Sequence, residues 1–378
     1  MRPLFPLSLA VALIISSVGF PTHASGQQSS DAQPASSSAP RSAMQSPGAF
    51  HIYTSDGVPA TLDEVVAATD TTDVVFIGEV HDDANAHVLQ DSIWQQMVER
   101  SQGRDVALSL EMFERDVQPV LDEYLSGSIT ERHFTEDARA WQSYPTAYRP
   151  LVETAKQNGV PVLAANAPRR YVNRVARSGR EGLSELSAWA KQWVAPLPFP
   201  GPSKAYREKW ERLMRTAMPA GHGTEGGEST DAGSTDSEST DSESTDSATH
   251  DRDRSSSAAQ QSTAQQETAS HVAPHGTGVH GSPGKQPVSP MLLAQSLWDA
   301  TMAYTIAEHL TRYPGHRVLH VTGAFHVSKK TGTPEALQHY RPGTRALVVL
   351  IRPVDDPRAF DQDAHTGLGD FVILTGKD

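Results

Sequence analysis

The chain has 378 residues, a formal net charge of −13 at pH 7 and no cysteine. The lack of cysteine excludes disulfides, cysteine-ligated zinc, iron–sulfur clusters, a cysteine nucleophile and the lipid-acceptor cysteine of a bacterial lipoprotein. Eleven acidic and only three basic residues fall between Pro219 and Val288, so most of the acidity belongs to one segment. The remaining chain has no basic stripe of the kind that predicts nucleic-acid binding.

The first 24 residues have the pattern of a secretory signal peptide. Arg2 supplies a positive charge, residues 4–20 are mostly apolar, and small side chains precede a cut after Ala24. We therefore expect cleavage near Ala24 and a soluble periplasmic or secreted protein. Residues 25–49, rich in Ser, Ala, Gln and Pro, are expected to form a disordered leader. The alternative is that the apolar run stays as a membrane anchor.

Predicted strands alternate with predicted helices along the rest of the chain. Short apolar runs rich in β-branched residues predict strands at 74–79, 106–111, 160–166, 317–323, 346–351 and 371–374. Apolar periodicity, caps and helix-ending glycines predict helices at 84–101, 116–125, 148–158, 168–177, 206–214, 290–313 and 334–340. This order predicts an α/β fold with a mostly parallel sheet flanked by helices.

A long insert interrupts the predicted domain. Residues 50–218 form its first part and residues 289–378 its second part. Between them, residues 219–288 are acidic and rich in Ser, Thr and His, and repeat Thr-Asp-Ser-Glu-Ser. Such a segment cannot bury enough apolar surface to offset its conformational entropy, so we expect it to be disordered.

Each buried strand is expected to end in a polar side chain. The strand at 74–79 ends at Glu79 and His81, the next strands end at Glu111 and Asn166, and the strand at 317–323 runs out at His326. Parallel strands end at one edge of a sheet, where open α/β folds bind ligands. We therefore expect these side chains to converge on a shared rim. The alternative for each is a cap that merely ends a strand or begins a helix.

Three other polar residues give weaker indications. Arg169 follows Pro168 at a predicted helix start beside the same edge, where it would either hold an anion or be an ordinary surface arginine. Asp299 lies off the apolar stripe of its helix, which favours a solvated carboxylate. His87 is one turn into a predicted helix and is expected to be a surface residue or core filler.

The chain resembles the ChaN-like haem-binding family, part of the haem-binding-uptake and Tiki-like superfamily, in six short blocks that keep the family's order. The blocks are residues 78–82, 111–115, 148–151, 165–169, 299–303 and 323–326. They extend over nearly all of the chain outside the leader and insert. The resemblance implies an exported α/β domain that binds haem in bacterial iron acquisition. It also makes an outer-membrane haem transporter and a second copy of the chain candidate partners.

The resemblance also implies how haem would be held. A haem site needs an axial ligand for iron, cations or N–H groups for the propionates, and an apolar surface for the macrocycle. Ferric iron accepts a phenolate oxygen well, and Tyr148 stands in a family block, so we expect Tyr148 to be the haem-iron ligand. Tyr144, one helical turn earlier, is the reserve. Ligation by His81 or His326 is left open.

Two other functions are left open. The superfamily resemblance extends to erythromycin-esterase-like and Tiki-type metal-dependent hydrolases. In that case Glu79, His81 and His326 would bind a divalent metal such as Mn, Co or Zn. Glu79 and Glu111 would be the catalytic carboxylates, with Glu111 as general base on a bound water. The third possibility is an envelope interaction protein with a vestigial site. The resemblance favours haem binding by a protein that is not an enzyme, with a metal-dependent hydrolase as the alternative.

Overall fold

The computed structural model describes residues 49–101, 105–217 and 288–377. The predicted signal peptide, nearly all of the leader and residues 219–287 of the predicted insert lie outside these described residues. Within the described ranges, no helix combines the length and the apolar character needed to cross a membrane.

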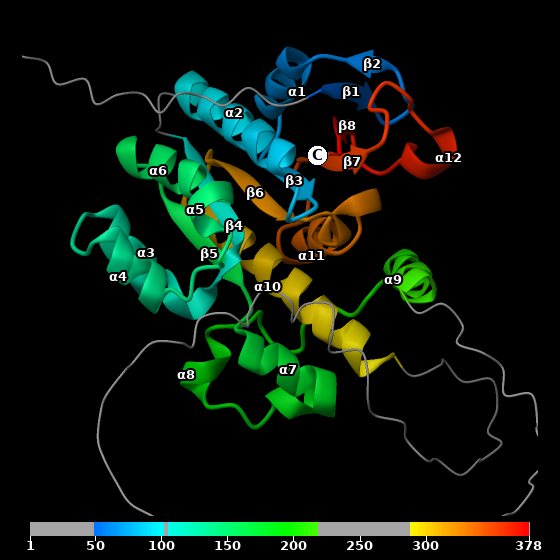
Figure 1. Cartoon of the computed structure of the whole chain (residues 1–378). Helices are drawn as coiled ribbons and strands as arrows, with labels where there is room; N and C mark the ends of the chain where they lie inside the picture. Colours follow the sequence, from blue (N-terminus) through cyan, green and yellow to red (C-terminus); the bar gives the residue numbers. More distant parts are fainter. Residues whose placement is uncertain (1–48, 102–104, 218–287, 378) are drawn as a thin grey trace, which may run out of the picture. The chain divides into compact units, whose positions relative to one another are not determined.

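Eight strands form one sheet (Figure 1). Their order is β2 (Pro59–Ala60), β1 (Phe50–Thr54), β8 (Phe371–Gly376), β7 (Ala346–Val354), β3 (Val74–Glu79), β6 (Arg317–Gly323), β4 (Val106–Glu114) and β5 (Val162–Asn166). The strands from β8 to β5 run parallel, whereas β1 is antiparallel to β8 and β2. The predicted α/β fold with a mostly parallel sheet is therefore confirmed. Because β3 lies between β6 and β7, both parts of the chain that flank the insert build the same sheet.

Side chains of the central strands are buried on both faces of the sheet. Val75 and Ile77 of β3 pack into one apolar cluster, and Val74 and Phe76 pack into another on the opposite face. This two-sided burial explains why the strand is an uninterrupted apolar run rather than an alternation of apolar and polar residues.

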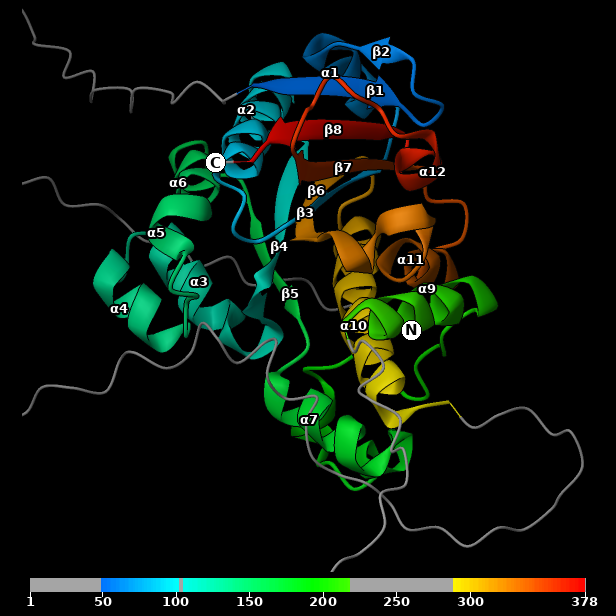
Figure 2. The ribbon, with the colours of Figure 1, turned by 45° about the vertical axis from the view of Figure 1, so that its right-hand side comes forward.

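Helices cover both faces of the sheet, as Figures 1 and 2 show. The face that holds Val75 is covered by α1 (Leu62–Thr69), α2 (Ala84–Ser101), α3 (Gln118–Leu125), α4 (Glu131–Asp137), α5 (Tyr144–Ala147) and α6 (Arg149–Gln157). The face that holds Phe76 is covered by α10 (Pro290–Arg312) and α11 (Thr333–Tyr340). The other helices are α7 (Arg169–Ser178), α8 (Ala188–Lys191) and α9 (Lys204–Ala217), which pack on α10, and α12 (Gln362–His365). Short 3₁₀ turns are η1 (Arg115–Val117), η2 (Arg180–Leu183), η3 (Ala324–His326) and η4 (Ser328–Lys330).

Several predicted elements match the structure to the residue. These are β3, α2 and β6, and Asp83 caps α2 by accepting the backbone N–H groups of Asn85 and Ala86. Strands β1 and β2 and helix α1 were not predicted from the sequence. Strand β2 has only two residues, and a segment this short has no periodicity to detect.

The carboxyl ends of β3, β6 and β4 are neighbours at one edge of the sheet. Glu79 at the end of β3 is in register with Gly323 at the end of β6. On the other side of β6, Val321 is in register with Leu110, one residue before Glu111. Strand β4 continues to Glu114, so the predicted strand end at Glu111 was three residues too early. Glu111 nevertheless lies directly after the last residue of β4 that pairs with β6, within reach of the ends of β3 and β6.

Candidate functional site

Glu79 is a buried carboxylate that accepts hydrogen bonds on both oxygens. Its Oε1 atom accepts from the Tyr148 hydroxyl at 2.6 Å and from Nδ1 of His81 at 2.8 Å. Its Oε2 atom accepts from the Gln90 amide and lies 3.3 Å from Nδ1 of His87. Burial raises the pKa of Glu79, but the hydrogen bonds from His81 and His87 outweigh burial and lower this pKa to about 2. Glu79 is therefore ionised.

His81 is the partly exposed member of this network. Its side chain is 34% exposed and packs edge-on against Trp141, with the ring centroids 5.1 Å apart. Burial lowers the pKa of His81, but the hydrogen bond to Glu79 and the charge of Glu111 raise it above the ordinary value. Nδ1 is held by Glu79, whereas Nε2 has no hydrogen-bond partner within the described part of the chain. In the neutral ring, this arrangement leaves the lone pair on Nε2.

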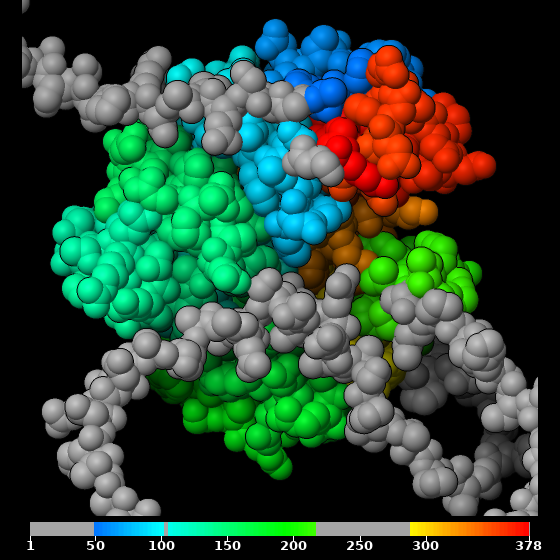
Figure 3. Space-filling view, viewed as in Figure 1, coloured from blue at the N-terminus to red at the C-terminus, as the bar shows by residue number. Residues whose placement is uncertain are grey.

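Gly323 allows the His81 ring to approach the end of β6. A Cβ atom at position 323 would lie 3.0 Å from Nε2 of His81 and 3.7 Å from Oε2 of Glu111. A side chain there would push the imidazole away by a few tenths of an ångström, so the glycine permits this close approach. In Figure 3 the light-blue turn after β3 and the orange segment after β6 lie next to each other on the surface.

Glu111 lies on the other side of this glycine and is also buried. Its Oε2 atom accepts from the Thr322 hydroxyl at 2.6 Å and from the Gly323 backbone N–H at 2.7 Å. Its Oε1 atom is 3.7 Å from Nε2 of His326. Burial raises the pKa of Glu111, but the positive charges of His326 and His81 lower it below the ordinary value.

His326 is held by a second carboxylate, Asp299 of α10. Nδ1 of His326 lies 2.8 Å from Oδ1 of Asp299, which also accepts from the Thr333 hydroxyl at 2.9 Å, while Oδ2 accepts from the Tyr206 hydroxyl. Asp299 is only 2% exposed. The sequence-based expectation of a solvated carboxylate was wrong, because α9 and the turn before α11 cover this side of α10.

Two carboxylate–histidine pairs therefore flank Glu111. Glu79 binds Nδ1 of His81, and Asp299 binds Nδ1 of His326. Both imidazoles interact electrostatically with Glu111. Such an arrangement fixes the orientation of each ring, favours its protonated form, and can either transfer protons or present a ring nitrogen to a metal centre.

The structure thus brings together Glu79, His81, Glu111 and His326, as the sequence predicts. Asn166 lies at the same edge, but its side chain accepts the N–H of the following residue, Ala167, at 2.9 Å. It therefore serves as a local cap, which is the alternative that the sequence left open.

Of the three remaining predicted site residues, Tyr144 and Arg169 lie outside this cluster. Tyr144 is buried against Phe113 and Phe134 in an aromatic group. Arg169 is exposed, and its backbone N–H donates to Glu114. Arg169 fits the interpretation of an ordinary surface arginine.

Tyr148 lies in the cluster but has no exposed surface. Its hydroxyl donates to Glu79, and burial followed by the negative charge of Glu79 raises its pKa above the ordinary value. The hydroxyl therefore keeps its proton in this arrangement. An iron ion would reach it only after the bond to Glu79 broke and the covering side chains moved.

Sequence reasoning missed four partners of the cluster: His87, Gln90, Asp299 and Tyr206. His87 and Gln90 are three residues apart on α2, so they share one face of the helix, and that spacing was a usable signal. No spacing in the sequence predicts the contact between Tyr206 of α9 and Asp299 of α10, because this contact depends on how the two helices pack.

The residues do not form a divalent-metal site of the expected kind. Among the described residues, no group of three or more His, Asp and Glu side chains is arranged to bind a metal ion. Glu79, His81 and His326 are the expected ligands; the Nδ1 atom of each histidine is bound to a carboxylate, which leaves only the Nε2 atom of each ring for a metal.

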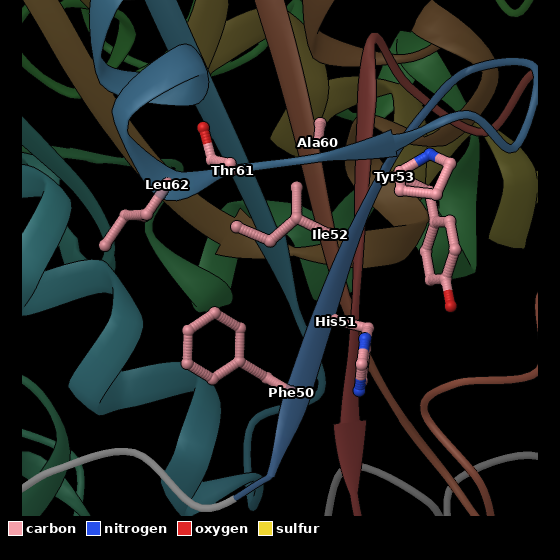
Figure 4. Close-up of a pocket in the computed structure, with 8 residues that line it drawn as sticks. Phe50, His51, Ile52, Tyr53, Ala60, Thr61 and Leu62 are labelled. Carbon is pink, nitrogen blue, oxygen red and sulfur yellow. The ribbon is translucent and has the colours of Figure 1, made fainter.

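Two cavities lie beside other parts of the sheet. One, of about 520 Å³, is lined by Asp299 and Tyr206 together with residues of α11 and β7. The other, of about 200 Å³, lies at the β1–β2 edge and is lined by residues 50–53 and 59–62 (Figure 4). The smaller cavity contains none of the predicted site residues.

The family model described as haem-binding uptake, Tiki superfamily, ChaN matches residues 65–337. Among solved structures, ChaN of Campylobacter jejuni, determined with cofacially bound haem, is 14% identical with a TM-score of 0.54; the match covers 87% of this chain and 97% of that chain. An erythromycin esterase in its open conformation is 10% identical with a TM-score of 0.41, covering 87% and 98%. A Bacillus cereus protein is 10% identical with a TM-score of 0.38, covering 84% and 92%. No curated protein sequence is significantly similar to the chain.

Proposed function

The chain belongs to the ChaN family of the haem-binding uptake, Tiki superfamily, and we propose that it binds haem at the exposed side of His81. One observation supports this site most strongly. The buried Glu79 holds Nδ1 of His81, and Nε2 has no hydrogen-bond partner within the described ranges. A carboxylate that orients a histidine in this way makes the other ring nitrogen a better ligand for iron.

His81 suits the axial position better than Tyr148 in this structure. The His81 side chain is 34% exposed, whereas Tyr148 has no exposed surface. The Tyr148 hydroxyl and Nδ1 of His81 bind the same oxygen of Glu79. In this proposal Tyr148 is a positioning residue that holds Glu79 against His81, and direct ligation by Tyr148 is the alternative that the experiment distinguishes.

The surroundings of His81 fit the rest of a haem group. Trp141 packs against the ring, and Val80 beside it is 36% exposed, which gives the macrocycle an apolar surface. Arg139 comes just after α4 and binds Glu114, the last residue of β4, and Asp116, with its side chain 51% exposed. Arg139 can provide a cation for a propionate. Bound haem would supply the redox and light-absorbing chemistry of its iron.

The proposed role is haem handling during bacterial iron uptake. The family supports haem as the ligand, and the signal-like pattern of the first 24 residues supports export to the periplasm or beyond. An outer-membrane haem transporter would then be the partner. Cell fractionation, followed by capture of cross-linked membrane proteins, tests this role; recovery of the protein only from the cytoplasm would contradict it.

The site supports hydrolysis as a second candidate function. Glu111 lies between two imidazoles whose Nδ1 atoms are held by carboxylates. Such a group can pass a proton between water and a leaving group. Glu111→Gln would abolish hydrolysis of ester or amide substrates and leave haem affinity unchanged, which separates this function from the first.

The main experiment is an absorbance titration of the purified protein with haemin. We expect a Soret band that saturates at a defined haem-to-protein ratio. Titration of the His81→Ala variant beside His339→Ala, which removes an exposed histidine, locates the site. A wild-type protein that gave no saturable band would overturn the proposal.

A further inference from the structure

The larger cavity is lined by Asp299 and Tyr206, two partners of the cluster described above, but not by His81. It has a volume of about 520 Å³, within the range of about 300–1,000 Å³ typical of small-molecule sites. Its walls come from the segment 200–203, from α9 and α10, from the beginning of α11 and from the first residues of β7. Figure 2 shows α9 next to α11 on this side of the molecule. Neither His81 nor Glu111 lines it.

Most charged groups at this cavity are already paired. The ammonium group of Lys330 lies 2.6 Å from a carboxylate oxygen of Asp370. Both oxygens of Asp299 accept hydrogen bonds, from His326 and from the Tyr206 hydroxyl among others. These groups have their electrostatic partners within the protein and do not require a ligand.

Glu335 is different, because one of its two carboxylate oxygens has no hydrogen-bond partner among the described residues. Its Oε2 atom accepts from the Ser203 hydroxyl at 3.1 Å and from the Gly332 backbone N–H at 3.3 Å. Among the described residues, its Oε1 atom accepts no hydrogen bond and no basic side chain forms a direct ion pair with it, although the charge of the Lys209 ammonium group acts on it from a greater distance. The two bonds to Oε2 fix the side chain, so its second oxygen is a preorganised acceptor at the cavity wall.

The rest of the lining is largely apolar. Pro202, Pro334, Ala346 and Val348 contribute hydrocarbon surface around this carboxylate. A ligand with an apolar body and one positive group would bury its body against these residues and place its charge on Glu335. A charge-assisted hydrogen bond to a carboxylate is about twice as strong as a neutral one.

We propose that this cavity binds a small organic cation, with its ammonium group on Oε1 of Glu335 and its apolar body against Pro202, Pro334 and Val348. The site is separate from the proposed haem surface and does not depend on haem binding. It is selective for charge, because a neutral molecule of the same shape would leave the carboxylate unpaired and an anion would be repelled by it.

The proposal is tested with three probes of equal length and different charge: n-butylamine, n-butanol and butyrate. Binding to the haem-free full-length protein is measured by calorimetry, and the site is located by NMR shifts of α11 amides. We expect n-butylamine to bind at least tenfold more tightly than n-butanol, and butyrate to bind more weakly still. Glu335→Gln keeps an acceptor for the Gly332 N–H and should weaken amine binding at least tenfold.

Glu208→Gln is the matched control, because it removes the same charge from the exposed side of α9. It should leave amine affinity unchanged. If Glu335→Gln does not fold, Ala346→Leu fills the cavity while keeping the carboxylate, and should also abolish amine binding. Equal affinity for n-butylamine and n-butanol would overturn the proposal. Unchanged amine affinity in the Glu335→Gln variant would also overturn the proposal. If that variant does not fold, unchanged amine affinity in the Ala346→Leu variant would overturn it.

Discussion

Glu79 and His81 form a carboxylate–imidazole pair in which Oε1 of the buried acid lies 2.8 Å from Nδ1 of the partly exposed ring. The acid is fixed by three further donors, so the ring orientation is set by a rigid network rather than by a surface contact. This pair connects the core of the domain with the surface on which we place the haem.

His81→Ala should reduce haem affinity by tenfold or more and change the Soret band, since it removes the proposed iron ligand. The Tyr148→Phe variant should keep the Soret band of the wild type and lose less haem affinity than His81→Ala, because Tyr148 acts on the iron ligand only through Glu79. Absorbance titration of both variants checks this. A spectrum that changes in Tyr148→Phe and not in His81→Ala would establish Tyr148 as the ligand.

Glu79→Gln should weaken both folding and haem binding. The amide keeps one acceptor oxygen but cannot satisfy four buried or half-buried donors, which costs about 1–3 kcal/mol of unfolding free energy. Haem affinity should fall by about 10–100-fold, because the orientation of His81 is lost. Urea unfolding and haemin titration measure the two effects. Unchanged stability would mean that the network observed around Glu79 contributes little to folding.

Gly323→Ala should disturb haem binding with little loss of stability. The new Cβ would lie 3.0 Å from Nε2 and 3.2 Å from Cε1 of His81, so the ring must move. Gly376→Ala is the control, because its Cβ would lie 3.6 Å from the nearest heavy atom, which is an ordinary contact. A haem spectrum identical in both variants and in the wild type would show that haem does not contact His81.

The buried His320 should lower the unfolding free energy of the protein at acidic pH. It is fully buried in β6 with Nδ1 near the Ser109 hydroxyl, and burial lowers its pKa to about 3. The pKa of His320 in the folded protein lies below the ordinary value of 6.5. Above pH 6.5 the ring is therefore neutral in both the folded and the unfolded protein, and its burial costs no stability through protonation. Stability is lost as pH falls from 6.5 towards 3, by up to about 1.4 kcal/mol per pH unit.

The comparison with His320→Phe isolates this effect from the other histidines. Unfolding free energies are measured for both proteins at pH 7 and pH 5. The wild type should lose stability relative to the variant by about 2 kcal/mol over this interval. A difference between the two proteins that does not change with pH would rule out a depressed pKa for His320.

The sequence by itself determined the chain order of the parallel strands and of the longer helices between them, and the polar residues at or near the carboxyl ends of β3, β4 and β6. Apolar periodicity is a local property, so β3, α2 and β6 were predicted with correct limits. The convergence of Glu79, Glu111 and His326 followed from one rule, because parallel strands end at one edge of their sheet.

Tertiary structure alone decided which of these side chains act together. Asp299 is buried because α9 and the turn before α11 cover α10, and no local pattern shows that the helix is enclosed on that side. Packing on the other face of the sheet buries Tyr148, while the His81 side chain stays partly exposed. The packing of α9 and α11 beside α10 forms the cavity next to Glu335. Exposure and hydrogen-bond partners depend on neighbours distant in sequence, so the folded chain was needed to separate ligand candidates from the residues that position them.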